Sequence, residues 1–99
     1  MVQAGYYSAT MTYLKAVAAA GTTDANEVMA MLRKIKINDM FASGGYIRAD
    51  GVMIHNMYVM QVKSPQESKY PWDYYKVVKV MGGEQAFGPI AGLCPLAPK

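Results

Sequence analysis

The side chains with the most obvious chemical potential in this 99-residue sequence are its one histidine and its one cysteine. A nucleophilic pair would have to join Cys94 to His55, and no local pattern supports it. His55 is therefore interpreted as a hydrogen-bonded surface or interface residue. These two residues supply too few ligands for a zinc site within one chain, so we predict no metal and no cofactor. Cys94 is left as a buried thiol, a free thiol, or the partner of a cysteine outside this sequence.

Four carboxylates fall in or near predicted turns, namely Asp50, Glu67, Asp73 and Glu84. Two of them could act as a general acid and base, but solvated turn residues are the simpler interpretation. The stretch AGYYSA is not the G-x-S-x-G nucleophile elbow, and MGGEQAFG lacks the G-K-[ST] ending of a phosphate-binding loop. We predict that the chain is not an enzyme.

Aromatic residues give a weaker indication of binding. Tyr6 and Tyr7 stand beside Gly5 at the predicted start of a helix. Helix N-termini attract carboxylates, and tyrosines there could close over a small ligand, although core packing explains them equally well. Trp72 follows Pro71 in a loop, where we expect it to anchor that loop to the core.

Two helices are predicted in the first part of the chain. Residues 1–4 are expected to be extended and Gly5 to allow a turn, before an alanine-rich helix over Tyr6–Ala20. That helix is apolar over much of its circumference and is expected to be buried on more than one side. Asp24, with Glu27 three residues later, resembles a capping pair for a second helix. This helix follows the pattern Val28, Leu32 and Ile35.

Antiparallel strands are predicted after this helical hairpin. A short strand at Tyr46–Arg48 turns at Ala49-Asp50-Gly51 into a long strand over Val52–Lys63. A loop over Ser64–Trp72 then leads to a strand over Asp73–Met81, and residues 82–99 are expected to be irregular. Both faces of the long strand are largely apolar, which a one-sided antiparallel strand would not require. The predicted class is α+β, a helical hairpin followed by antiparallel strands.

The composition indicates that part of the surface of this chain is covered by other protein. Hydrophobic residues make up 53% of the chain and charged residues only 17%, whereas a typical domain carries about 25% charged residues. A domain of this length has a thin core. The net charge of +3 is too small to indicate nucleic-acid binding. No charged N-terminal region precedes an apolar core, so no signal peptide is expected in this chain. We therefore expect an additional covering partner, either a second copy or protein outside this sequence.

Two long stretches carry a family resemblance. QAGYYSATMTYLKAVAAAGTTDANEVMAMLRKIKIND resembles the late helical hairpin of type I periplasmic binding proteins. GYIRADGVMIHNMYVMQVKSPQESKYPWDYYKVVKVMGGEQAF resembles the strands after that hairpin in a proteobacterial subgroup associated with branched-chain amino acids. The shared features, in order, are Arg48, the Asp50-Gly51 turn, a strand ending at Gln61-Val62-Lys63, and the stretch Pro71–Lys76. The tail around Cys94 also looks like the end of that subgroup.

The resemblance implies a particular architecture and role. Members of the family are two-lobed α/β proteins with three crossing strands, and this chain resembles only their C-terminal portion. Residues 1–45 would then be a helical hairpin in one lobe, residues 46–81 hinge-crossing and second-lobe strands, and residues 82–99 an irregular tail. Ligand contacts near the start of the first helix would carry over to Gln3, Gly5, Tyr6 and Tyr7. Cys94 could match a cysteine that pairs with one earlier in a longer chain.

Two hypotheses remain for the function. In the first, the chain is a C-terminal fragment of the solute-binding protein of an ABC importer, which captures an amino acid or similar small carboxylate in the periplasm for a membrane permease. The fragment alone should not be ligand-competent. In the second, the chain is a self-sufficient small α/β protein that works as a homodimer. Both predict a homo-oligomer of the 99-residue chain, which could form by strand exchange.

Overall fold

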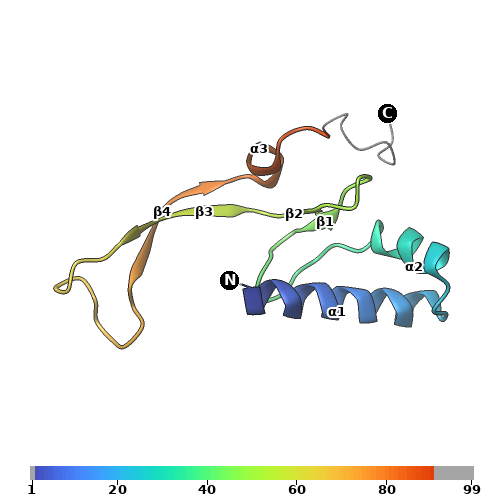
Figure 1. The fold of residues 1–99 in the computed structure, drawn as a ribbon, viewed down its shortest axis with the longest axis horizontal. Coiled ribbons are helices and arrows are strands. Elements are labelled where there is room, and N and C mark those ends of the chain that lie inside the picture. Colours follow the sequence, from blue (N-terminus) through green and yellow to red (C-terminus); the bar gives the residue numbers. More distant parts are fainter. Residues whose placement is uncertain (1, 91–99) are drawn as a thin grey trace.

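The computed structural model describes residues 2–90, which form an elongated molecule of 53 × 32 × 18 Å (Figure 1). Its radius of gyration is 16.8 Å, whereas a compact chain of about 100 residues has a value of about 13 Å. Its accessible surface is 7447 Å², against about 5,600 Å² expected for a folded monomer of its mass. The chain therefore leaves roughly 1,800 Å² more surface exposed than a compact monomer would.

The helical hairpin consists of α1 (Val2–Ala20) and α2 (Ala25–Leu32). The helix α1 begins at Val2, so the expected extended lead-in and the turn at Gly5 are wrong. A glycine inside a helix costs only about 1 kcal/mol relative to alanine, and the residues around Gly5 outweigh that cost. Gly21 follows α1 with a φ of +69°, the left-handed conformation that commonly ends helices.

The predicted cap of α2 is confirmed. The side chain of Asp24 accepts hydrogen bonds from the backbone N–H groups of Asn26 at 3.0 Å and Glu27 at 3.1 Å. The helix ends at Leu32, one turn earlier than the pattern through Ile35 suggested. Among the described residues, no helix is long and apolar enough to cross a membrane.

The face that α1 buries is made of small residues. Ser8, Thr12 and Ala16 follow one another at intervals of four, and all three are buried. This stripe lies against α2 and the segment after it, where Val28, Ile37 and Ala42 are buried too. Most of the large side chains of α1 remain exposed, namely Val2, Tyr6, Tyr7, Tyr13 and Leu14. The expectation that α1 is buried on more than one side is therefore wrong within the described residues.

The first strand pair is short. The strand β1 (Tyr46–Ile47) pairs in antiparallel fashion with β2 (Met53–Ile54), and the predicted turn between them is present. Gly51 has a φ of +84°, which explains the glycine at this position. Arg48 forms a bidentate ion pair with Asp50 at 3.0 and 2.7 Å and also donates to the carbonyl oxygen of Gly88 at 2.6 Å. These contacts fix the turn against the chain that follows the last helix.

The long predicted strand is divided in two. The chain pairs with β1 as far as Ile54, and β3 (Met57–Val62) then begins a separate pairing with β4 (Tyr75–Met81). Between them, the centroid of the His55 ring lies 4.8 Å from that of Phe41 and 5.1 Å from that of Phe87, so aromatic side chains from two distant segments contact this point. A single continuous strand is therefore wrong, because the backbone changes partners where side chains from distant segments meet.

The β3–β4 pair forms a two-stranded ribbon that extends away from the helices (Figure 1). Residues paired across antiparallel strands lie on the same face. One face, here called the apolar ribbon face, consists of Tyr58 opposite Val80, Met60 opposite Val77, and Val62 opposite Tyr75. The opposite ribbon face carries Met57, Val59, Gln61, Lys76, Lys79 and Met81. A bulge between Val59 and Met60 leaves Val78 as the extra residue of β4.

The tail contains one further element. The helix α3 (Gly83–Phe87) follows β4, so the expectation of an irregular segment over residues 82–99 is wrong for this stretch. A Cβ atom on Gly83 would lie 2.6 Å from Cγ2 of Ile54, so α3 approaches β2 too closely for any larger residue. The hydroxyl of Tyr46 also donates to the carboxylate of Glu84. Cys94 and the rest of residues 91–99 lie outside the described residues.

Candidate functional site

The residues proposed from the sequence as ligand contacts all lie in the first two turns of α1. Gly5 and Tyr6, together with Val2 and Ala9, line a shallow hollow of about 280 Å³ on one side of the helix. Tyr6 is 70% exposed and Tyr7 48% exposed. Gln3 and Tyr7 are four residues apart, so they lie on one side of the helix. Neither of them lines the hollow. The structure thus brings Gly5 and Tyr6 together and leaves Gln3 and Tyr7 beside them.

The charge environment of this helix end is simple. The first turn of α1 contains no acidic residue, so its positive dipole end has no compensating side chain there. The free N–H groups of a first helical turn are suited to a carboxylate. The hollow is open to solvent and bounded on one side only, so these residues form a wall and not an enclosed pocket.

A partly buried polar contact, which the sequence did not predict, positions this wall. Ser8, the most deeply buried polar residue of α1, donates from Oγ to Oδ2 of Asp39 at 2.6 Å. Oδ1 of Asp39 accepts from the backbone N–H groups of Phe41 at 2.8 Å and Ala42 at 2.9 Å. The contact joins α1 to the 38–42 segment. The Asx-turn pattern after Asp39 was the signal that could have indicated it.

Asp39 remains a carboxylate in this position. Desolvation by burial raises the pKa of Asp39, but the hydrogen bonds from Ser8, Ala42 and Phe41 together outweigh it. The distant positive charge of Lys15 acts in the same direction as the hydrogen bonds, so the pKa lies below its ordinary value. The ionised acceptor holds three donors at once, which makes Asp39 a structural residue of the helical region.

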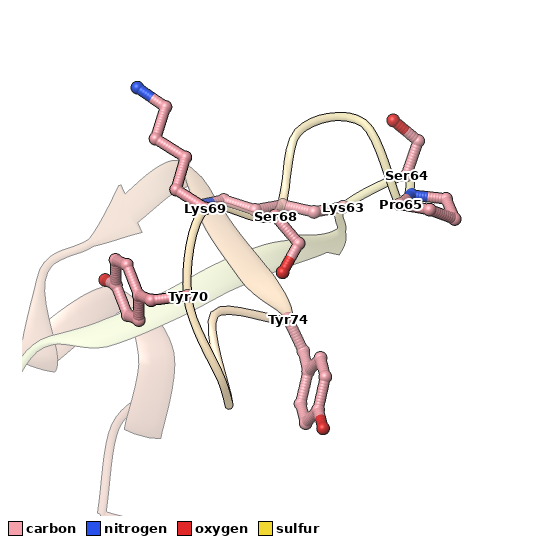
Figure 2. A pocket seen from close by; sticks show the side chains of 7 residues that line it. All are labelled: Lys63, Ser64, Pro65, Ser68, Lys69, Tyr70 and Tyr74. Atoms are coloured by element: carbon pink, nitrogen blue, oxygen red, sulfur yellow. The ribbon is translucent and has the colours of Figure 1, made fainter.

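A second hollow, of about 550 Å³, lies at the far end of the β3–β4 ribbon. It is lined by Lys63, Ser64, Pro65, Ser68, Lys69, Tyr70 and Tyr74 (Figure 2). Figure 2 shows the rings of Tyr70 and Tyr74 on different sides of the loop and the side chain of Lys69 extending away from it. Small-molecule sites need polar groups that converge on one point, and these side chains diverge.

Two carboxylates hold the loop around this hollow in shape. Asp73 is buried and accepts from Nζ of Lys63 at 2.6 Å and from the backbone N–H of Lys69 at 3.1 Å. Glu67 pairs with Lys76 and accepts from the backbone N–H of Ser64 at 2.9 Å. The pKa of Asp73 is lowered, first by the hydrogen bond from Lys63. The hydrogen bond from Lys76 is the main cause that lowers the pKa of Glu67 to about 2.

Trp72 does not anchor this loop to the core, contrary to the prediction from the sequence. Its side chain is 82% exposed and contacts Tyr74 edge to face, with ring centroids 6.0 Å apart. The backbone N–H of Asp73 donates to the carbonyl oxygen of Tyr70 at 3.2 Å, and Trp72 has a φ of +74°. This is the geometry of a type II turn with Pro71 at its second position. Trp72 occupies the third position, where glycine is preferred, so its backbone is strained.

Each of the four carboxylates expected to be solvated has a specific partner, and Glu67 and Glu84 are also exposed to solvent as expected. Asp50 pairs with Arg48, Asp73 with Lys63, and Glu67 with Lys76, while Glu84 accepts from the hydroxyl of Tyr46. In residues 2–90 no three potential metal ligands of the His, Cys, Asp or Glu type gather at one place. His55 is half-buried between two aromatic rings, and its Nδ1 lies 2.9 Å from the carbonyl oxygen of Asn56, as a hydrogen-bonded histidine should.

Comparison with known proteins provides an independent line of evidence. The model of a family described as "Periplasmic binding protein" matches residues 1–69. A periplasmic binding protein from Burkholderia mallei is 65% identical over 83% of this chain, with a TM-score of 0.79. A branched chain amino acid ABC transporter periplasmic ligand-binding protein from Burkholderia xenovorans is 47% identical over 88% of this chain, with a TM-score of 0.83. No curated protein matches the chain.

The lengths of these relatives matter for the interpretation. The chain spans 22% of the B. mallei protein and 23% of the B. xenovorans protein. Its helical hairpin and antiparallel strands are therefore an α+β part of the two-lobed type I periplasmic-binding fold. The match over residues 1–69 and the high identity to two solved structures together show that the chain belongs to the periplasmic binding protein family.

Proposed function

We propose that this chain forms the C-terminal portion of the solute-binding protein of an ABC importer. The protein would capture an amino acid or similar small carboxylate in the periplasm and deliver it to a membrane permease. The observation that carries this proposal is the 47% identity, over 88% of the chain, to a branched chain amino acid ABC transporter periplasmic ligand-binding protein. Capture would proceed by closure of two lobes around the ligand, without covalent chemistry.

The division of the chain between lobes is part of the same proposal. Residues 1–45 would belong to one lobe, residues 46–81 would cross the hinge and enter the second lobe, and residues 82–99 would form the tail. The shape supports this division, since the ribbon extends away from the helical hairpin and buries little against it (Figure 1). The excess exposed surface of roughly 1,800 Å² is the area that the remaining parts of such a protein would cover.

The ligand wall proposed here is the N-terminal end of α1. Tyr6 and Gly5 line its hollow, Gln3 and Tyr7 flank it, and the free N–H groups of the first turn would face a ligand carboxylate. The wall is exposed because the opposing wall is not among the described residues. The 99-residue chain alone should therefore bind amino acids very weakly or not at all, since binding sites bury most of a ligand's surface.

Calorimetry with a chimera tests the proposal. Residues 1–90 would replace the matching segment of the B. xenovorans protein, and leucine, valine and isoleucine would be titrated into it. We expect the chimera to bind at least one of them, the Tyr6→Ala variant to bind at least about tenfold more weakly, and Tyr13→Ala on the same helix to bind normally. A folded chimera that binds none of them would overturn the proposed role, as would micromolar binding by the 99-residue chain alone.

A second candidate is a self-sufficient α/β protein that works as a homodimer. The observation that favours it is the same excess surface, which a second copy could cover as well as a second lobe could. The genomic DNA before the codon for Met1 distinguishes the two. Binding-protein sequence in frame upstream supports the importer role, and its absence supports the homodimer.

A further inference from the structure

We propose that Asp50-Gly51 is a latent site of aspartate isomerisation, and that the ion pair with Arg48 slows this reaction in the folded chain. The sequence contains one Asp–Gly dipeptide and no Asn–Gly dipeptide. Isomerisation is fast at Asp–Gly because glycine has no side chain that hinders its backbone nitrogen. The product, isoaspartate, adds one carbon atom to the backbone of the turn between β1 and β2. The inference does not depend on the solute-binding role proposed above.

The reaction takes place between two neighbouring residues and needs only water. The backbone nitrogen of Gly51 attacks Cγ of the protonated Asp50 side chain, an N–Cγ bond forms, and the carboxyl hydroxyl leaves as water with the proton of the Gly51 N–H. Water then adds to the backbone carbonyl of the resulting succinimide and breaks its bond to that nitrogen, so Gly51 stays joined through the side chain. Because no other reagent enters the turn, the reaction is independent of which other parts of a longer protein lie nearby.

The first constraint acts on the carboxyl group that would be attacked. Arg48 holds both of its oxygens, since Nε lies 3.0 Å from Oδ1 of Asp50 and Nη2 lies 2.7 Å from Oδ2. The side chains of this pair are each only 14% exposed. A bidentate pair fixes the orientation of a carboxylate and favours its ionised form. The hydrogen bond from Arg48 is the main cause that lowers the pKa of Asp50, which reduces the protonated, reactive fraction.

The second constraint acts on the attacking nitrogen. The backbone N–H of Gly51 donates to the carbonyl oxygen of Arg48 at 2.9 Å, so this nitrogen is part of a hydrogen-bonded turn. The backbone N–H of Arg48 in turn donates to the carbonyl oxygen of Val52 at 2.9 Å and closes the hairpin. Attack on Cγ requires the nitrogen to leave its hydrogen bond and the backbone between Asp50 and Gly51 to rotate. The turn therefore has to open before the reaction can start.

Arg48 is itself held in place. Its Nη1 donates to the carbonyl oxygen of Gly88 at 2.6 Å, so the guanidinium is fixed by the chain after α3 as well as by Asp50. Exposed ion pairs are weak partly because two long side chains lose freedom when they meet. An arginine that is already fixed on a second side loses less freedom in the pair with Asp50. The contact with Gly88 thus supports the protection of Asp50.

Digestion with endoproteinase Asp-N tests the proposal, because this protease cuts before aspartate and not before isoaspartate. The 99-residue chain would be incubated at mildly acidic pH and digested, and mass spectrometry would follow the peptide over residues 39–72 that remains uncut at position 50. We expect Arg48→Met to accumulate this peptide at least about fivefold faster than the original chain. In urea, where the pair is absent, both chains should react equally fast, and faster than the native original by at least the same factor.

Arg33→Met is the matched control. It removes the same charge at an exposed position at the end of α2, and it should react like the original chain. Far-UV circular dichroism checks that each variant is folded. If Arg48→Met is unfolded, Arg48→Lys is measured in its place, since lysine keeps the charge but cannot hold both oxygens of Asp50 in the same way.

Three results would overturn the inference. The first is an original chain that reacts as fast in the native state as in urea, which would show that the fold gives no protection. The second is a folded Arg48 variant that reacts at the rate of the original chain, which would show that the pair is not the cause. The third is equal acceleration by Arg33→Met and the Arg48 variant, which would show that net charge and not this contact controls the rate.

Discussion

The helical hairpin and the β3–β4 ribbon achieve order in different ways. The hairpin buries a stripe of α1 against α2 and the following segment, and the half-buried carboxylate of Asp39 accepts hydrogen bonds from three donors there. Every residue of β3 is exposed, and the end of the ribbon is held by ion pairs in the 63–76 loop. The helical region therefore contains most of its own core. The ribbon has a regular hydrogen-bonded backbone, but its side chains are not buried.

The largest expected effect tests the core of the helical region. Ala16 is completely buried where α1 meets α2, so Ala16→Asp would bury a charge without a partner. We expect a loss of at least about 3 kcal/mol in the free energy of unfolding. Ala18→Asp, at an exposed position of the same helix, should cost less than about 1 kcal/mol. Urea denaturation measures both, and similar losses would mean that the α1–α2 contact is not the core of this region.

A smaller effect is expected at the carboxylate that joins α1 to the 38–42 segment. Asp39→Ala removes the acceptor of Ser8, Phe41 and Ala42 and should cost about 1–3 kcal/mol. The folded-state pKa of Asp39 is depressed, so its contribution is present above its ordinary value of 3.8 and lost as the pH falls through the folded value. Chemical denaturation from pH 7 to pH 2 should show a smaller acid-induced loss in Asp39→Ala, and an identical loss would contradict this role.

At the ribbon end, a substitution that removes a large side chain should not destabilise the protein. Trp72→Gly relieves a positive φ and removes little packing, so we expect a change between zero and about 1 kcal/mol of stabilisation. Trp72→Ala keeps the strain and should give no gain. Thermal unfolding of the two variants distinguishes them. A marked loss in both would show that Trp72 packs against something in the folded protein.

The smallest expected effect concerns the 63–76 loop. The pKa of Glu67 is lowered to about 2 by Lys76 and Ser64, so its stabilising contacts are complete above its ordinary value of 4.5 and lost as the pH falls toward 2. We expect NMR signals of the loop to change between pH 4.5 and pH 2 with little effect on the helices. Lys76→Met should move the titration of Glu67 upward. A Glu67 that titrates near 4.5 in the original chain would mean that the ion pair does not form in solution.

The elements that could be predicted from the sequence are those that local chemistry controls. The Asp24 cap needs only the backbone N–H groups of the next turn, and the Asp50-Gly51 turn needs only a glycine that accepts positive φ. The predictions that were wrong concern elements whose structure depends on residues far away in the sequence. The strand is interrupted near His55, where the rings of Phe41 and Phe87 contact it. The helix α3 can lie close to β2 because Gly83 has no side chain.

The candidate sites divide in the same way. The sequence indicated a ligand wall at the start of α1, and the structure brings only Gly5 and Tyr6 together in a hollow. The sequence did not reveal that Ser8 and Asp39 position this wall, since they are 31 residues apart and meet only in the folded chain. It also could not reveal which residues of β4 join Tyr58, Met60 and Val62 on one face, because the bulge near Met60 alters the register.

By itself, the sequence determined the order of the elements, the family resemblance, and an excess of apolar residues over what 99 residues can enclose. These depend on local propensity, spacing and composition, which are properties of the chain as written. The tertiary structure alone decided where that excess lies: exposed along the ribbon and along α1, while small residues of α1 form the packed interface. The physical reason is that burial depends on which segments meet in the folded chain. Contacts between residues far apart in the sequence set the register of β3 with β4 and bring α1 against the 38–42 segment.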